Sequence, residues 1–143
     1  SKADLMDWGP TSHENTLGAN PIVVAAALAV LDVLLEERLM ENAEKVGGYM
    51  LKRFEEMMDQ YDLIGDVRGK GMMVGIEFVK DRETKEYATE ERDDLILETF
   101  KRGLLILGAG PSSIRLAPPL ITTMDQADIG VRIFEEALRT VSK

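Results

Sequence analysis

The longest apolar stretch of the chain lies near its N-terminal end and predicts a helix that is hydrophobic on every side. Every residue from Ile22 to Leu35 is apolar except Asp32. Asn20 is a typical N-cap residue, and Pro21 suits the first helical position because its missing N–H would have no partner there. A helix without a polar face is normally buried on most sides. In a chain of 143 residues, this pattern predicts that something outside the chain covers part of the helix.

Three later segments have apolar residues at the spacing of an amphipathic helix. The first covers about residues 41–61, and the second covers about residues 90–102, for which Thr89 is the candidate N-cap. The last helix follows Thr123, whose spacing from Gln126 is that of a capping box. Because each helix has one apolar face, we expect all three to pack against a common core.

Two pairs of short extended segments lie between these helices. Residues 72–79 alternate apolar positions with polar or small ones, which is typical of a strand with one buried face. The glycine-rich residues 63–71 precede that strand, and a second pair is predicted at residues 104–107 and 114–117. Strands that come in adjacent pairs between helices favour an α+β fold, with a small, mostly antiparallel sheet covered by helices.

Charge and composition exclude several classes of function. The formal net charge is −9, which argues against binding to nucleic acid or to an anionic membrane surface. The chain has no cysteine and a single histidine, His13, so disulfides, thiolate catalysis and metal sites built from cysteines or several histidines are excluded. No secretory signal opens the chain, and its apolar run is shorter than the roughly 20 residues of a membrane span. We therefore expect a soluble, cytoplasmic protein.

The segment Arg68-Gly69-Lys70-Gly71 superficially resembles a phosphate-binding loop. Such a loop follows a strand and opens a helix, whereas here a predicted strand follows. We interpret the glycines as positions of close backbone packing or of a bulge. Lys70 is interpreted as an exposed or edge-strand lysine, and no lysine of this chain is a convincing imine-forming residue.

Two other groups of residues have simple structural interpretations. The acidic cluster falls in the first turn of a predicted helix, where carboxylates favour the positive end of the helix dipole; it consists of Glu90, Glu91, Asp93 and Asp94. We prefer this interpretation to a metal site. His13 has no partner nucleophile and no metal-ligand spacing, so it is interpreted as a loop histidine.

Two residues remain as candidates for binding chemistry. Arg115 lies between Ile114 and Leu116 on a predicted strand, so its side chain points away from the face that these two residues bury. An arginine held by the rigid glycine and proline flanks of this strand is a preorganised fork for a carboxylate, and the alternative is a solvent-facing edge arginine. Thr16 precedes the first helix, and its hydroxyl either binds a phosphate or satisfies the loop backbone.

Three segments, taken in order, resemble the C-terminal part of class III aminotransferases. Residues 13–21 (HENTLGANP) are similar to the H-x-x-T-[FY]-G-G-N-P element of that family. Residues 65–72 (GDVRGKGM), with Glu77, are similar to its G-[DE]-V-R-G-x-G-L-M…E element, and residues 114–120 (IRLAPPL) are similar to its I-R-x-x-P-P-L strand. Residues 103–120 resemble the 4-aminobutyrate aminotransferase group most.

The resemblance implies the fold type I of pyridoxal phosphate (PLP) enzymes, with a large cofactor-binding domain and a C-terminal small domain. Residues 1–20 would be a remnant of the large domain, residues 21–38 the connecting helix and residues 39–143 the small domain. A connecting helix would explain why the first helix is too hydrophobic for this chain alone. In this family the lysine that binds the cofactor lies upstream, so we expect the chain by itself to be inactive.

The resemblance also implies roles for individual residues. Thr16 matches the threonine that contacts the cofactor phosphate from the neighbouring subunit of a homodimer. Arg115 matches the arginine that pairs with the substrate α-carboxylate. Leu17 replaces the usual aromatic residue and Ala19 the usual second glycine, so the loop near the phosphate departs mildly from the pattern.

The activity that the resemblance implies is PLP-dependent transfer of an amino group between an amino acid and a 2-oxo acid. The expected donor is 4-aminobutyrate or another ω-amino acid. Two alternatives within the family are an amino-acid racemase and an ornithine or acetylornithine aminotransferase. An alternative of another class is a stand-alone ligand-binding or dimerisation module.

Overall fold

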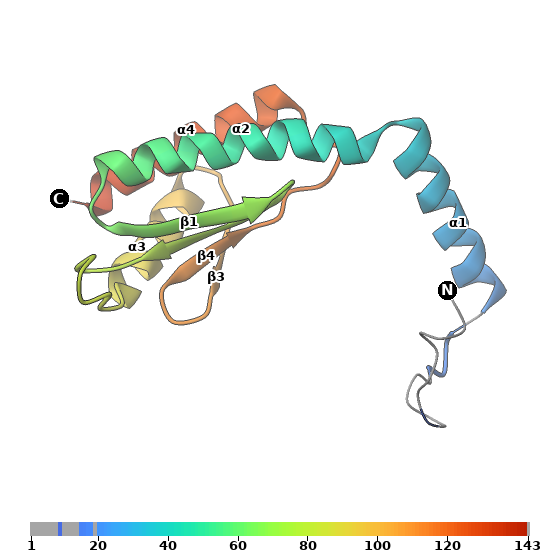
Figure 1. The fold of residues 1–143 in the computed structure, drawn as a ribbon, viewed down its shortest axis with the longest axis horizontal. Coiled ribbons are helices and arrows are strands. Elements are labelled where there is room, and N and C mark those ends of the chain that lie inside the picture. The colour runs from blue at the N-terminus through green and yellow to red at the C-terminus, as the bar shows by residue number, and fades with distance from the viewer. Residues whose placement is uncertain (1–8, 10–14, 19, 143) are drawn as a thin grey trace. The chain divides into compact units, whose positions relative to one another are not determined.

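The structure of the chain is a computed structural model, and it describes residue 9, residues 15–18 and residues 20–142. These residues belong to two compact units, Ser1–Glu37 and Arg38–Lys143. The helices and strands follow the chain in the order shown in Figure 1. Their bounds are α1 (Pro21–Glu36), α2 (Leu39–Gln60), β1 (Ile64–Lys70), β2 (Met73–Phe78), α3 (Thr89–Lys101), β3 (Leu107–Ala109), β4 (Ser113–Leu116) and α4 (Met124–Val141).

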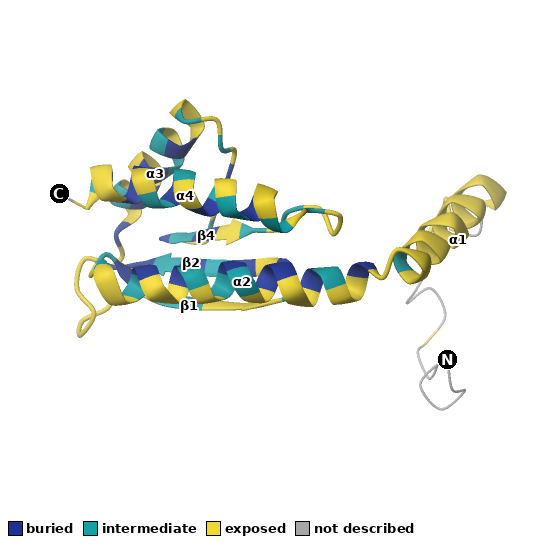
Figure 2. Ribbon diagram, turned by 90° about the horizontal axis from the view of Figure 1, so that it is seen from above, coloured by how far each residue is buried: buried dark blue, intermediate teal, exposed yellow. Residues whose placement is uncertain are grey.

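Helix α1 is the regular element of the first unit, and it begins where the sequence predicts. The Asn20 side chain accepts a hydrogen bond from the backbone N–H of Ile22 at 3.0 Å, and Pro21 takes the first helical position. None of the residues of α1 is buried, and its ribbon in Figure 2 has the colour of exposed residues along most of its length; Leu34 is intermediate. The apolar side chains of α1 are therefore available for burial, and their cover by something outside the chain stays a prediction.

The second unit contains a four-stranded antiparallel sheet with the strand order β1-β2-β4-β3. This arrangement confirms the predicted α+β class. In the register of the sheet, Gly75 of β2 lies opposite Arg115 of β4, and Arg115 lies opposite Leu107 of β3. Strand β4 is thus a central strand, flanked on both sides, while β1 and β3 form the edges.

Helices α2 and α3 contact the strands on one face of this sheet, and α4 packs against these two helices over the same core. The strand residues of that face include Ile76 and Phe78 of β2 and Ile114 of β4, which are fully buried. Phe54 of α2 meets Phe134 of α4 edge to face, with ring centroids 5.0 Å apart. A stripe of buried residues follows α2 in Figure 2, as expected for an amphipathic helix on a core. The opposite face of the sheet carries the exposed side chains and is called the open face below.

Two predicted boundaries were wrong, one because of a hydrogen bond that closes the end of α3 and one because of a contact with a distant loop. The predicted strand at 104–107 begins only at Leu107, because the backbone of Leu104 closes the end of α3 by donating to Thr99 at 2.9 Å. Gly103, at φ +88°, permits this closure. Thr89 is not the N-cap of α3; its hydroxyl instead donates to the carbonyl of Pro111 at 3.0 Å.

Other local predictions are confirmed. Thr123 and Gln126 form the complete capping box at the start of α4. The strand register shifts at Gly65, and an ideal Cβ at Gly69 would lie 2.6 Å from the carbonyl oxygen of Met73. These glycines therefore serve a bulge and close backbone packing, not a phosphate loop.

Candidate functional site

Arg115 lies on the open face of the sheet, in the central strand β4. Its neighbours in the chain, Ile114 and Leu116, face the core, with Ile114 fully buried and Leu116 partly buried. Because strand side chains alternate, Arg115 points to the opposite face, where it is exposed. On that face its cross-strand neighbours are Gly75 on one side and the exposed Leu107 on the other. The predicted orientation of Arg115 is confirmed.

Arg115 differs from the other arginines because its guanidinium has no partner among the residues that the structure describes. Among the residues that the structure describes, no hydrogen bond or ion pair reaches Arg115. Every other arginine donates to a carboxylate, a backbone carbonyl or a tyrosine hydroxyl. In a chain with 26 acidic residues and a net charge of −9, an unpaired guanidinium is available to an anion from outside the unit. Its planar fork suits a carboxylate in particular.

A second arginine on the open face, Arg68 of β1, is already neutralised. Its guanidinium donates to Asp66 and also reaches Glu77 at 3.5 Å. The hydrogen bond to Asp66 is the main reason that the pKa of Arg68 is raised above its ordinary value, and the charges of Asp66 and Glu77 add to it. Arg68 and Arg115 are thus separated by Gly75 and differ in their freedom to bind an anion.

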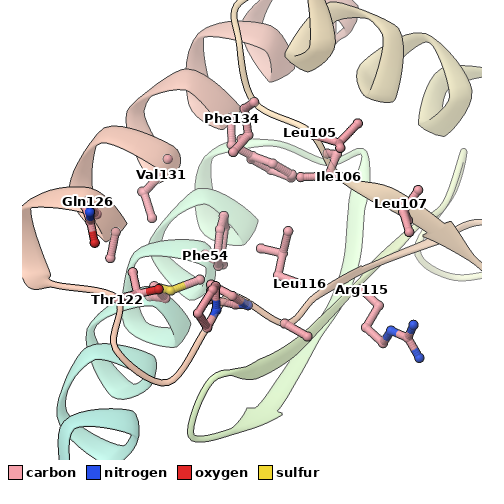
Figure 3. Close-up of a pocket in the computed structure, with 17 residues that line it drawn as sticks. Phe54, Leu105, Ile106, Leu107, Arg115, Leu116, Thr122, Gln126, Val131 and Phe134 are labelled. Carbon is pink, nitrogen blue, oxygen red and sulfur yellow. The ribbon is translucent and has the colours of Figure 1, made fainter.

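An apolar groove of about 510 Å³ lies beside Arg115. Phe54, Val131 and Phe134 line its inner part, and the exposed Leu105 and Leu107 lie along its rim. In Figure 3 the guanidinium of Arg115 extends away from the phenylalanine side chains and from Val131. The charged group therefore sits at the edge of the groove, where an anion can reach it without being buried among apolar side chains.

The hairpin that carries Arg115 is held by a residue that the sequence did not single out. Arg92 of α3 is buried, and its guanidinium donates to three backbone carbonyls of the β3–β4 hairpin. In the sequence, Arg92 lies within the acidic cluster Glu90–Asp94, a pattern that is typical of a solvent-exposed charged residue. Its only sequence signal is that it is the single basic residue of that cluster.

Thr16 lies in the first unit, within the turn 15–18 that precedes α1. The Asn15 side chain accepts from the N–H of Leu17 at 2.9 Å, and the N–H of Gly18 donates to the Asn15 carbonyl at 3.1 Å. The turn is therefore satisfied without Thr16, whose hydroxyl is exposed and has no partner within the described residues. A free hydroxyl in an ordered turn fits the phosphate group that the family resemblance implies for it.

Three expectations concern residues or features away from these two positions. His13 and Ala19 lie outside the described residues. Within the described part of the chain, no three acidic or histidine side chains are grouped so that they could hold a metal ion. Over the same residues, no helix combines the length and the hydropathy that crossing a membrane requires. Thr16 and Arg115 belong to different units.

Comparison with known proteins shows which family the chain resembles throughout its length. The sequence profile described as Aminotransferase class-III matches residues 1–138. The leucine/methionine racemase of Thermococcus litoralis is 40% identical over 143 residues, which is 99% of this chain and 32% of the racemase. The mitochondrial alanine–glyoxylate aminotransferase 2 of Homo sapiens is 40% identical over 129 residues, which is 88% of this chain and 25% of that enzyme.

Solved structures agree with the sequence comparison. An amine transaminase from an uncultivated Pseudomonas species, in its PLP-bound form, superposes with a TM-score of 0.83 at 34% identity, covering 92% of this chain and 30% of the transaminase. A Bacillus anthracis aminotransferase gives the same TM-score at 32% identity, covering 90% of this chain and 30% of its own. These matches confirm the small C-terminal domain of fold type I and support pyridoxal phosphate as the cofactor.

The chain spans about a third or less of the length of the relatives it matches. Those relatives include racemases and an alanine–glyoxylate aminotransferase, so the expected placement in the 4-aminobutyrate group is not confirmed. The profile match over residues 1–138 and the 40% identity to relatives along nearly the whole chain establish that this chain belongs to the class III aminotransferase family.

Proposed function

We propose that the chain is the C-terminal part of a PLP-dependent enzyme that moves an amino group between an amino acid and a 2-oxo acid, and that Arg115 binds the substrate carboxylate. One observation carries this proposal. Within the described residues, Arg115 alone among the arginines has an unpaired guanidinium, and it faces the open side of the sheet. Both the amino acid and the 2-oxo acid carry a carboxylate, so one arginine serves both substrates.

The surroundings of Arg115 support this role. Gly75 and Leu107 are its cross-strand neighbours, so no carboxylate of this sheet row competes for the guanidinium. The acidic pair on the open face, Asp66 and Glu77, forms ion pairs with Arg68. A bidentate contact to a planar guanidinium fixes both the position and the orientation of the substrate.

The cofactor, when bound, supplies the electron sink for bond breaking at the amino carbon. Of this chain's residues, Thr16 would donate its hydroxyl to the cofactor phosphate. The N-terminus of α1 contributes less, because Pro21 lacks an N–H and the N–H of Ile22 is bound to Asn20. We place the lysine that binds the cofactor in the part of the protein upstream of this chain, and we propose a cytoplasmic homodimer.

The proposed domain plan follows from the same assignment. Residues 1–20 would belong to the large cofactor-binding domain, residues 21–38 to the connecting helix and residues 39–143 to the small domain. The exposed apolar side chains of α1 support this plan, because Ile22 is 80% and Leu35 is 65% exposed. A connecting helix would bury them against the rest of the enzyme.

The test uses the complete enzyme expressed from the gene that encodes this chain. We expect Arg115→Lys to raise KM for the amino acid and for the 2-oxo acid about 10- to 100-fold, because a hydrogen bond to a charged group contributes roughly 1.5–3 kcal/mol. Arg132→Lys is the matched control, since Arg132 is an exposed arginine of α4 that pairs with Asp128 at 3.0 Å. Unchanged kcat/KM in both half-reactions of Arg115→Lys would refute the carboxylate role.

Racemisation is the second candidate function. Three relatives are described as a leucine/methionine racemase, an alanine/serine racemase and an isoleucine 2-epimerase. A racemase would use Arg115 for the same carboxylate but would need no 2-oxo acid. Incubation of the enzyme with one enantiomer of leucine, methionine or alanine, with and without a 2-oxo acid, separates the two: loss of optical purity without a 2-oxo acid indicates racemisation.

The finer expectation of an ω-amino donor rests on the similarity of residues 103–120 to the 4-aminobutyrate group. Measured kcat/KM values for 4-aminobutyrate, ornithine, acetylornithine and alanine test it directly. The stand-alone module is tested by the mass of the natural product that an antibody against this chain isolates. A colourless protein of this chain's own mass, 15.9 kDa, would replace the enzyme proposal with a binding or dimerisation module.

A further inference from the structure

Arg92 is a buried arginine whose hydrogen bonds are made to the hairpin that carries Arg115. Its side chain is 9% exposed. The guanidinium donates to the carbonyls of Gly110 at 3.3 Å, Pro111 at 3.2 Å and Ser113 at 3.1 Å, and its Nε donates to Asp93 at 2.7 Å. Two carbonyls of the loop and that of Ser113, the first residue of β4, are thus held by one side chain from α3.

The hairpin has a matching space for this guanidinium. An ideal Cβ at Gly108 would lie 2.8 Å from Nη1 of Arg92, so a side chain at position 108 would displace the group. The Thr89 hydroxyl, one helical turn before Arg92, donates to the same Pro111 carbonyl at 3.0 Å. Two residues from the N-terminal part of α3, Thr89 and Arg92, therefore donate hydrogen bonds to the hairpin of β3 and β4.

The hydrogen bonds from Arg92 reach the sheet close to Arg115. Ser113, whose carbonyl accepts from Arg92, is two residues before Arg115 on the same strand. Strand β3 spans only Leu107–Ala109, is an edge strand and pairs with β4 alone. So short a ladder leaves the twist of the hairpin under-determined, and Arg92 supplies the additional constraints.

A purely stabilising role does not require a charge at this position. Burying a guanidinium costs desolvation, and apolar residues of similar volume often replace buried charges without loss of stability. A guanidinium does have donors in a rigid fork, which allows it to fix several carbonyls in one geometry. Arg102, which follows the same helix, makes a different set of contacts, to Glu98 and to Thr140 of α4.

We propose that Arg92 is a positioning residue that holds the β3–β4 hairpin so that Arg115 meets the substrate carboxylate in the correct orientation. The proposal rests on the proposed carboxylate role of Arg115. Arg92 does not contact the substrate. It acts by fixing the orientation of strand β4, which carries Arg115. A misplacement of about 1 Å is enough to lower the efficiency of a binding group substantially.

The experiment is a double-mutant cycle in the complete enzyme, with Arg92→Met, Arg115→Lys and the double variant. We expect Arg92→Met to raise KM for the amino acid by about tenfold, with a smaller change in kcat. In the Arg115→Lys background, Arg92→Met should raise KM by less than about twofold. The reason is that the guanidinium of Arg115, which Arg92 orients, is already absent. Arg92→Lys, which keeps the charge but loses the fork, gives an intermediate KM and guards against a variant that fails to fold.

Two further measurements separate positioning from general stability. Arg102→Met is the matched control, since it removes an arginine at the end of α3 that does not contact the hairpin, and its KM should be unchanged. Hydrogen–deuterium exchange should be faster in residues 107–116 of Arg92→Met and unaltered in α2. This readout is independent of activity and of the bound cofactor.

The outcomes distinguish the two proposals. Additive effects of Arg92→Met and Arg115→Lys on KM, an equal rise in KM with Arg102→Met, or unaltered exchange in residues 107–116 would overturn the positioning role alone. An unchanged KM in Arg115→Lys would overturn the carboxylate proposal, and the positioning role with it.

Discussion

Arg115 in β4 is the register partner of Gly75 in β2, and Gly75 is in turn the partner of Arg68 in β1. A position without a side chain therefore separates the two arginines on the open face. An ideal Cβ at Gly75 would come no closer than 3.8 Å to any neighbouring atom, the nearest being the carbonyl oxygen of Arg68. A side chain could therefore be accommodated at position 75. Because the residue is glycine, the surface next to Arg115 on this side is not covered by a side chain.

The first prediction concerns this space at Gly75. We expect Gly75→Leu to fold normally but to raise KM for carboxylate substrates several-fold, because the new side chain would occupy the surface next to the guanidinium of Arg115. Gly75→Ala, whose Cβ makes only ordinary contacts, should leave KM nearly unchanged. Steady-state kinetics of both variants and their thermal unfolding midpoints provide the measurement. An unaltered KM in Gly75→Leu would show that the carboxylate does not approach across β2.

The second prediction compares two adjacent glycines of α2. Gly47 is buried, and a Cβ there would overlap the backbone of Gly71 in the turn between β1 and β2, whereas Gly48 has nothing within 4 Å. We expect Gly47→Ala to destabilise the fold by about 1–3 kcal/mol, as overpacking does. Gly48→Ala should stabilise it by about 0.5–1 kcal/mol through helix propensity. Denaturant unfolding of the two variants tests this, and equal effects would contradict the close approach of α2 to the turn.

The third prediction concerns the link between α2 and the segment before α4. The Asn42 amide donates to the carbonyls of Leu120 at 2.7 Å and Thr122 at 3.0 Å. Asn42→Ala should lower the free energy of unfolding by about 1–2 kcal/mol, because two carbonyls lose their donor. Glu44→Ala, at an exposed position of the same helix, is the control. Hydrogen exchange should become faster in residues 117–123, and unchanged exchange there would show that the link is not needed.

The fourth prediction concerns the pH dependence of stability at Glu98. Hydrogen bonds from Arg102 and from Lys101 lower the pKa of Glu98 below its ordinary value of 4.5. A carboxyl group whose pKa is lower in the folded state stabilises the fold above its unfolded pKa, and this stabilisation is lost as pH falls through the folded pKa. Glu98→Gln should therefore be less stable than the parent near neutral pH, and the difference should disappear in acid below 4.5.

The measurement is denaturant unfolding of the parent and Glu98→Gln at a series of pH values. Glu98 is partly exposed, so the difference at neutral pH is expected to be small. A stability difference that persisted unchanged in acid would show that the charge of Glu98 is not the source of the effect.

Local sequence signals predicted the starts of two helices, α1 and α4, correctly. Asn20 with Pro21, and Thr123 with Gln126, act through contacts within one helical turn, so a few neighbouring residues suffice to recognise them. The alternation in 72–79 likewise predicted which side chains of β2 enter the core. Alternation along residues 114–116 also predicted correctly that Arg115 lies on the face opposite Ile114.

Two predictions were wrong, and only one of them depended on a partner far away in the sequence. Thr89 has the composition of an N-cap, but the carbonyl of Pro111 lies within reach in the fold and takes its hydroxyl instead. Leu104 has the apolar character of a strand residue, but its N–H closes the end of α3, which delays β3. At Thr89 a tertiary contact prevails over a local preference. At Leu104 the local closure of a helix end prevails over the preference for a strand.

The sequence by itself determined the family, the α+β class and the orientation of Arg115, because motifs and side-chain periodicity are properties of neighbouring residues. Only the tertiary structure decided that Arg68 is neutralised while Arg115 has no partner in the described part of the chain. It also decided that Arg92, which reads as a surface charge in an acidic cluster, is buried against the hairpin of Arg115. The physical reason is that the pairing of a charge depends on which strands and loops become its neighbours, and the register of the sheet sets this.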